Sequence, residues 1–289
     1  MTYSDFRFRQ LHRNEVENLV QMTDEVGWGF SAENWRIILS SGQIFLLVDE
    51  ANEIAATAAL FRYRDHLASI GSVIVRERFR GLGLASRVLD AAEDSLDLDR
   101  SIVQLIATKD GFPVYQSRGY RPIADCHRLV RPKRATQISV PSLPACRFDP
   151  VPPDMWEDVL DFDRKCNQVD RGQVLTAMFH AGYRTMAVFD QKTGQILGYA
   201  MSGPRKSMTV IGPVVAKDLS IACALVQMLI YGRSEDFRID ILSHQEAFCA
   251  VMNREGFCLE DTSPVMVRGK GPLKNLQSDA YAIISQAFG

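Results

Sequence analysis

A short apolar run, Ile70–Val75, passes directly into a basic segment with two glycines, Arg76–Ala85, and this junction constrains the fold more than any other part of the chain. After it, apolar side chains recur at intervals of about four residues, which is typical of a helix with one buried face. These positions are Leu84, Ala85, Val88, Leu89 and Ala92. The pattern predicts a strand, a loop and a helix that begins where the glycines end.

A second strand and a short helix are predicted next, at Val103–Thr108 and Phe112–Arg118, with Gly119 as a left-handed helix end. Upstream, Ile44–Val48 and Ile54–Phe61 flank a polar turn, which indicates an antiparallel hairpin. Helices and strands therefore alternate, and we expect an α/β chain.

The residues before the hairpin predict one strand and two helices. Phe6–Arg9 is the expected strand, and Asn14 can cap a helix that reaches about Val26. Ser31 is placed to cap a second, shorter helix that contains Trp35.

The same order of elements returns in the second half. Gly119 lies 44 positions after Val75, and Gly256 lies 41 positions after Val215. We interpret this agreement as a diverged internal duplication; the alternative is a coincidence between two small α/β domains.

The two halves are separated by a proline-rich, polar segment. We therefore expect one domain at 1–131, a linker at 132–144 and a second domain at 145–289. The last strand is expected at Pro264–Val267, and Leu276–Phe288 is expected to form a packing helix.

Bulk composition excludes several classes of protein. The 289 residues are 46% hydrophobic and 24% charged, with a formal net charge of −2, so nothing global favours nucleic acid or a membrane surface as partner. No apolar run is long enough to span a bilayer. Six scattered cysteines without a CxxC pair favour reduced thiols and no metal site. We expect a cytoplasmic protein, as a monomer or homodimer.

The glycine-bearing loop has the chemistry of an anion site. Arg78, Gly81 and Gly83 bring positive charge and exposed main-chain amides to the N-terminus of a helix, where the helix dipole favours negative charge. A phosphate or pyrophosphate is the natural ligand. The alternative is a surface turn that only caps the helix.

A dinucleotide-binding fingerprint fits this loop less well. Ser86 stands where the third glycine of G-x-G-x-x-G belongs, and the preceding strands come as antiparallel hairpins. The chain also lacks the G-K-[ST] sequence of a nucleotide P-loop.

Val73–Val75 followed by Arg78–Ala85 resembles the acyl-CoA-binding motif of GNAT-type N-acetyltransferases, Q/R-x-x-G-x-G/A after a strand. Leu105–Thr108 and Tyr115–Tyr120 resemble the next strand of that family and its Y-x-x-x-G-F/Y helix. The whole chain resembles tandem members, in which a diverged second GNAT domain follows the first. The resemblance implies two domains, each a mixed, mostly antiparallel sheet flanked by helices.

The resemblance also implies site residues. The backbone of Val73 and Val75 would pair with the pantetheine arm of acetyl-CoA as an added strand. The Val73 N–H would act as oxyanion donor, and Tyr115 would protonate the departing thiolate, because a phenol pKa of about 10 suits that leaving group. The alternative for Tyr115 is simple aromatic packing. The implied cofactor-binding residues are Val73, Ile74, Val75, Arg78, Arg80, Gly81, Leu82, Gly83, Leu84 and Ala85.

A general base is the missing part. The cofactor strand, Ala68–Val75, carries no carboxylate. Asp65, His66, Asp24 and Glu25 are the nearby candidates, each with ordinary surface exposure as the alternative. Glu25 and Trp28 are also the expected acceptor-side residues.

The second half departs from the motif. Ala216–Leu219 replaces the glycine loop, and Met252, which cannot donate a proton, stands at the position of the tyrosine. We expect this half not to bind acetyl-CoA productively. Asp163, Asp170 and Arg171 are candidates for an acceptor site, with a solvated face as the alternative.

The leading hypothesis is an N-acetyltransferase that uses acetyl-CoA as co-substrate, without a metal, and transfers its acetyl group directly to a primary amine in a ternary complex. The acceptor would be a small molecule or a peptide. The alternatives are an acyltransferase for a longer acyl-CoA and a non-catalytic acyl-CoA-binding regulator.

Overall fold

The computed structural model of the protein describes residues 5–63, 66–133, 143–271 and 280–288. Within them the chain forms two compact units. Unit 1 contains residues 5–122 with 266–271 and 287–288, and unit 2 contains residues 123–265 with 280–286. The boundaries of the predicted linker stay a prediction, and its residues 134–142 lie outside the described residues.

The sheet of unit 1 runs in the order β1-β2-β3-β4-β5. Neighbouring strands are antiparallel except β4 and β5, which are parallel. The predicted hairpin is confirmed as β2 and β3. The strands are β1 (Arg7–Phe8), β2 (Gln43–Val48), β3 (Ile54–Tyr63), β4 (Leu67–Val75) and β5 (Ile102–Ile106).

The predicted cap at Ser31 is confirmed, whereas the predicted cap at Asn14 is wrong, because Asn14 lies within η2 and Glu15 is the N-cap of α1. Ser31 caps α2 through its hydroxyl, which accepts a hydrogen bond from the Asn34 N–H at 3.2 Å, and Asn34 returns a bond to the Ser31 N–H. The helical segments are η2 (Arg13–Glu15), α1 (Val16–Glu25), α2 (Ala32–Ser41), η4 (Glu77–Phe79), α3 (Leu84–Glu93) and α4 (Phe112–Ser117).

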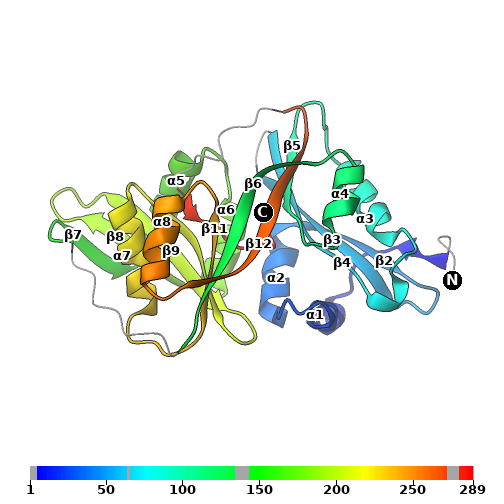
Figure 1. Cartoon of the computed structure of the whole chain (residues 1–289), viewed down its shortest axis with the longest axis horizontal. Coiled ribbons are helices and arrows are strands. Elements are labelled where there is room, and N and C mark those ends of the chain that lie inside the picture. The colour runs from blue at the N-terminus through cyan, green and yellow to red at the C-terminus, as the bar shows by residue number, and fades with distance from the viewer. Residues whose placement is uncertain (1–4, 64–65, 134–142, 272–279, 289) are drawn as a thin grey trace. The chain divides into compact units, whose positions relative to one another are not determined.

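The two faces of this sheet carry different helices. Ile70 of β4 packs with Leu89 of α3 and Tyr115 of α4 in one buried cluster, and Figure 1 shows α3 and α4 beside each other over the sheet. On the other face, the Phe61 ring lies against Gly42 at the end of α2. The alternation of side chains along a strand places Gly71 on this second face, because it pairs with Ala59, two residues from Phe61.

Unit 2 repeats this design. Its strands run in the order β6-β11-β10-β9-β8-β7, with β10 and β11 parallel and the other neighbours antiparallel. The strands are β6 (Arg121–Arg131), β7 (Cys146–Pro150), β8 (Arg184–Asp190), β9 (Ile196–Pro204), β10 (Thr209–Ala216), β11 (Phe237–Leu242) and β12 (Cys258–Gly269). Residues 121–122 of β6 and residues 266–269 of β12 belong to unit 1. The helical segments are η5 (Pro153–Met155), α5 (Trp156–Asn167), α6 (Gly172–His180), α7 (Leu219–Ile230) and α8 (Glu246–Arg254).

The structure aligns the two units in the register that the sequence predicts, with Val75 matching Val215 and Gly119 matching Gly256. The ladder of β4 with β3 is interrupted between Gly71 and Ile74, and the ladder of β10 with β9 between Ile211 and Val214. The final helices also end alike, since Gly119 and Gly256 both adopt left-handed φ values, +85° and +88°. The two units are therefore copies of one design.

The expected helix at Leu276–Phe288 is wrong. Residues 276–279 lie outside the described residues, but Ala280–Ala282 form a strand, β13, antiparallel to β10. The free edge of β10 supplies backbone partners that a helix would have to find within itself, so tertiary pairing overrides the local preference. Residues 287–288 belong to unit 1.

Candidate active site

The predicted cofactor strand separates from its parallel neighbour where the motif requires an opening. Within the described residues, β4 pairs with β5 only from Leu67–Ile102 to Ser69–Gln104. Beyond that point the chain bulges, and Ser72 takes a positive φ of 50°. Val73 and Val75 follow the bulge, beyond the last pair of β4 with β5, and are half-buried.

Polar atoms at this bulge suit a polar ligand. The buried Thr57 hydroxyl donates to the Ser72 carbonyl at 3.0 Å and holds the bulge in place. The hydroxyls of Ser69 and Ser72 are buried and find no hydrogen-bond partner among the described residues. A buried hydroxyl without a partner is costly, so a ligand or water that reaches the bulge would be stabilised there.

The glycine loop presents an open helix N-terminus. Gly81 and Gly83 both adopt positive φ, +79° and +74°, which glycine tolerates best. Gly83 is the N-cap of α3, and no side chain caps the first turn. A Cβ at Gly81 would meet nothing within 4 Å. The loop therefore leaves amides and space for an anion.

The basic residues of the loop pair with nearby carboxylates. Arg78 forms an ion pair with Glu53, which also lies 3.6 Å from the Arg76 Nε, and the half-exposed Arg80 lies 4.0 Å from Asp110. Arg76 is buried: its Nε donates to the Ile54 carbonyl at 2.8 Å and its guanidinium pairs with Glu25. The side chains of Arg78 and Arg80 are exposed and accessible to a ligand. The buried Arg76 instead holds the first residue of the loop against β3 and α1.

The candidate base and acceptor residues are only partly brought together. Glu25 lies near the loop but is paired with Arg76. Trp28 packs beside Phe30, with ring centroids 6.0 Å apart. His66 has a buried Nδ1 without a partner among the described residues. Asp65 lies outside the described residues.

Tyr115 lies in the cluster shared by β4, α3 and α4, and 7% of its surface is exposed. Burial raises the pKa of its phenol well above the ordinary value. The Tyr115 ring lies against Gly111, where a Cβ would come within 2.7 Å of Cε2. The Tyr120 ring meets it edge-on at 5.8 Å. The raised pKa makes this phenol a weaker acid than one with the ordinary value of about 10, on which the predicted match with the thiolate rests.

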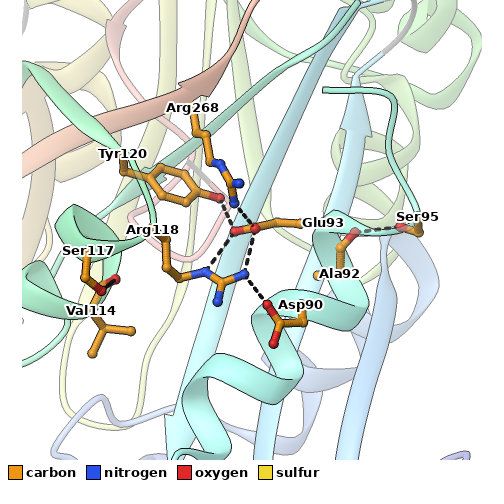
Figure 2. A network of polar contacts seen from close by, with 9 residues as sticks. All are labelled: Asp90, Ala92, Glu93, Ser95, Val114, Ser117, Arg118, Tyr120 and Arg268. Atoms are coloured by element: carbon orange, nitrogen blue, oxygen red, sulfur yellow. Dashed lines mark hydrogen bonds and ion pairs between the residues drawn. The ribbon is translucent and has the colours of Figure 1, made fainter. Parts of the chain in front are cut away.

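A buried carboxylate connects the two helices on this face, and sequence reasoning missed it. Figure 2 shows Glu93 of α3 enclosed by Arg118, Tyr120 and Arg268. Arg118 donates to Glu93 at 2.7 and 3.3 Å, and the Tyr120 hydroxyl donates at 3.0 Å. Arg118 also reaches Asp90 at 2.7 Å. The available signal was Arg118, a charged residue inside the motif that ends α4.

Unit 2 differs at the corresponding points. Met252 is fully buried, and its carbonyl accepts from the Phe257 N–H as the Tyr115 carbonyl accepts from Tyr120. Asp218 caps α7, since its carboxylate accepts from the Ile221 N–H at 2.9 Å. A carboxylate thus stands where unit 1 has an open N-terminus.

The polar candidates of unit 2 have partners within that unit. Asp163 is 1% exposed and accepts bonds from Arg171 and from the Tyr199 hydroxyl, the latter at 2.6 Å. Asp170 accepts from the Gly172 N–H at the start of α6.

The described residues contain no helix long and apolar enough to cross a membrane. They also contain no group of three or more His, Cys, Asp or Glu side chains placed to hold a metal ion.

Comparison with known proteins matches both halves to the same family. Residues 14–128 and residues 159–282 each match a model described as an acetyltransferase (GNAT) domain. The chain is 25% identical over 287 residues to the uncharacterized N-acetyltransferase YitH of Bacillus subtilis (strain 168), covering 97% of each chain.

Solved structures share the fold. A GCN5-related N-acetyltransferase from Sphaerobacter thermophilus matches with a TM-score of 0.69 and 15% identity, over 96% of this chain and 100% of that one. A tandem GNAT protein from the clavulanic acid biosynthesis pathway matches with a TM-score of 0.69 and 13% identity, over 92% and 99%.

Proposed function

Because the chain belongs to the GNAT acetyltransferase family, with two such domains in tandem, we propose that it transfers an acetyl group from acetyl-CoA to a primary amine. Unit 1 carries the reaction in this proposal. The observation that supports it best is the conjunction, within one unit, of an opening beside β4, an uncapped helix N-terminus at Gly83 and a tyrosine, Tyr115, packed in the same cluster as β4.

Each part of unit 1 has a task in binding acetyl-CoA. The amides from Gly81 to Ala85 would take the pyrophosphate, with Arg78 and Arg80 adding charge at the rim. The backbone of Val73–Val75 would pair with the pantetheine amides, as one strand pairs with another. The free edge of β4 after Ser69 supports this assignment.

The chemistry forms one bond and breaks one bond. The amine nitrogen attacks the thioester carbonyl, and the negative oxygen of the tetrahedral intermediate would accept a hydrogen bond from the Val73 N–H. The carbon–sulfur bond then breaks, and the thiolate takes the Tyr115 phenol proton. The nitrogen loses its own proton to water, which restores the phenol through the solvent.

Fewer structural observations support the proposed acceptor-binding residues. Glu25 and Trp28 stay our proposal for residues near the acceptor. Since Glu25 is paired with Arg76, we assign the deprotonation of the amine to water and not to this carboxylate. An amine that is partly neutral at working pH needs no stronger base.

Titration calorimetry of the full chain with acetyl-CoA, followed by an amine library screened for release of CoA, tests the proposal. We expect binding, and release of CoA with at least one primary amine. Absence of binding would refute the cofactor assignment. Binding with no acceptor for any acyl-CoA would favour a regulatory binding protein, and turnover only with longer acyl chains would favour the other alternative.

A further inference from the structure

Unit 2 contains the same opening between parallel strands, and its own chain fills it. β10 pairs with β11 only from Thr209–Phe237 to Ile211–Ile239. Past that point β10 still pairs with β9 on one edge, and on the edge that β11 has left it pairs with β13, Val214 opposite Ala282 and Val215 opposite Ala280. In unit 1, the described residues place no strand at the equivalent edge of β4.

The inserted segment contacts both sides of the opening. It pairs with β10 through Ala280 and Ala282, and the Ile283 N–H donates to the carbonyl of Asp240, in β11, at 3.1 Å. The segment therefore satisfies backbone groups of two strands that have parted from each other. An unpaired backbone group in a buried opening would be costly, so this occupancy stabilises unit 2.

The contact is close enough to restrict the residues of β10. A Cβ on Gly212 would stand 2.2 Å from the Ile283 carbonyl oxygen and 2.7 Å from that of Ile284, so only glycine fits. Ala280, Ala282, Ile283 and Ile284 are each at most 8% exposed. The segment is thus a buried part of the unit.

At the other end of the opening, the N-terminus of α7 has a hydrogen-bond acceptor from its own chain. The Asp218 carboxylate occupies the N-terminus of α7, where a phosphate would otherwise be attracted, and its negative charge repels one. Residue 213, the second residue of the interrupted stretch, is Pro213, which has no N–H to donate. The amide contacts that Val73 is proposed to make in unit 1 have no counterpart at this position.

We propose that the opening of unit 2 is a strand-binding site whose ligand is extended polypeptide, namely residues 280–284 of the same chain. The segment takes the place that the amide-bearing arm of acyl-CoA takes in unit 1. The comparison of this segment with the arm of acyl-CoA rests on the function proposed for unit 1. The pairing of β13 with β10 does not depend on that function. One chain should therefore bind one acyl-CoA, with the second opening closed from within.

Hydrogen exchange of the wild-type chain tests the pairing without any substitution. We expect the Ile283 amide to exchange at least about 100-fold more slowly than an exposed amide, as a bonded amide in a stable strand does. Exchange at the rate of an exposed amide would overturn the proposal. Calorimetry with CoA should give one site per chain, and two sites would overturn the proposal. No binding would refute the function of unit 1, and the exchange measurement would still decide the strand.

Replacement of residues 280–284 by glycine and serine in the full chain tests the occupant. We expect faster exchange at Val214–Ala216, reversed by a synthetic peptide with the sequence of residues 280–286. The matched control is the same peptide with I283P, which lacks the N–H that Asp240 accepts and should not restore protection. Unchanged protection in the variant, or equal rescue by both peptides, would overturn the proposal. If the variant does not fold, the wild-type exchange measurement decides.

Discussion

Gly71 of β4 lies against the carbonyl oxygen of Ala287, so closely that a Cβ on residue 71 would stand 1.9 Å from that oxygen. The neighbouring residue is held on the same face, because the Tyr63 hydroxyl donates to the Phe288 carbonyl at 2.7 Å. The Phe288 ring packs on Phe61, with centroids 5.0 Å apart. Residues 287–288 therefore line the sheet next to the bulge at which transfer of the acetyl group is proposed.

Gly71→Ala should displace this segment. The carbonyl of Ala287 is backbone and cannot rotate away, so the chain must shift to admit the methyl group. We expect a loss of about 1–3 kcal/mol in the free energy of unfolding, measured by denaturant titration. A variant as stable as the wild type would contradict the close approach.

Tyr63→Phe should destabilise the same contact less than Gly71→Ala does. It keeps the glycine and the ring but removes the hydroxyl that the Phe288 carbonyl accepts. We expect a loss of about 1 kcal/mol, typical of one hydrogen bond. A loss greater than that of Gly71→Ala would show that the hydroxyl, and not the steric fit, fixes residues 287–288.

Tyr115→Phe should lower turnover by about 100-fold while the dissociation constant of acetyl-CoA stays nearly constant. The ring remains, so the packing in the cluster with Tyr120 survives, and only the transferable proton is lost. Turnover is followed by release of CoA with the best amine of the screen. Unchanged turnover would refute the role of acid, and weaker binding would point to a structural role.

The ionisation of Tyr115 can be measured without an acceptor. Burial disfavours the charged phenolate, so the pKa of this phenol lies above the usual value of about 10 and the proton is retained as pH rises through 10. The difference in tyrosinate absorbance between the wild type and Tyr115→Phe, followed against pH, isolates this group. We expect no difference near pH 10. A difference that develops there would show that the phenol is exposed to solvent.

Glu53→Gln should strengthen the binding of acetyl-CoA. Glu53 forms an ion pair with Arg78, so it competes with the pyrophosphate for that guanidinium. Both side chains are partly exposed, and we expect a gain of only about two- to fivefold in affinity at low salt, which fades as salt is added. Titration calorimetry at two salt concentrations measures it.

Glu50→Gln is the matched control for that prediction. Glu50 is an exposed residue in the same hairpin turn, and its substitution changes the net charge by the same amount. An equal gain from both variants would mean that overall charge, and not the pair with Arg78, governs the affinity.

The sequence predicted those parts of the fold that local chemistry determines. The glycines at 81 and 83 and the cap at Ser31 take the conformations that their residue types favour. The register of the duplication followed from Gly119 and Gly256, because a left-handed helix end depends on few neighbours. These signals are confined to a few consecutive residues.

What the sequence did not predict depends on distant partners. Ala280–Ile284 is a short apolar run, which fits a strand or a helix equally well until the free edge of β10 is known. The sequence indicated Glu25 as a possible base. It did not indicate that Glu25 pairs with Arg76, which is 51 positions away in the chain. Glu93 is likewise indistinguishable from a surface residue at the end of a helix.

Glu93→Gln is therefore the substitution that best tests the core of unit 1. The carboxylate is 4% exposed and balances Arg118 and Arg268, so its neutralisation removes the ion pair of Arg268 with Glu93 and leaves Arg118 with only the exposed Asp90. We expect a loss of about 3 kcal/mol or more in the free energy of unfolding. Asp90→Asn is the matched control, since Asp90 also pairs with Arg118 but is 56% exposed, and it should cost less than about 1 kcal/mol. Thermal and denaturant unfolding of the two variants measure the difference. Equal losses would mean that the network behaves as a surface ion pair and does not fasten α4, with Tyr115, to α3.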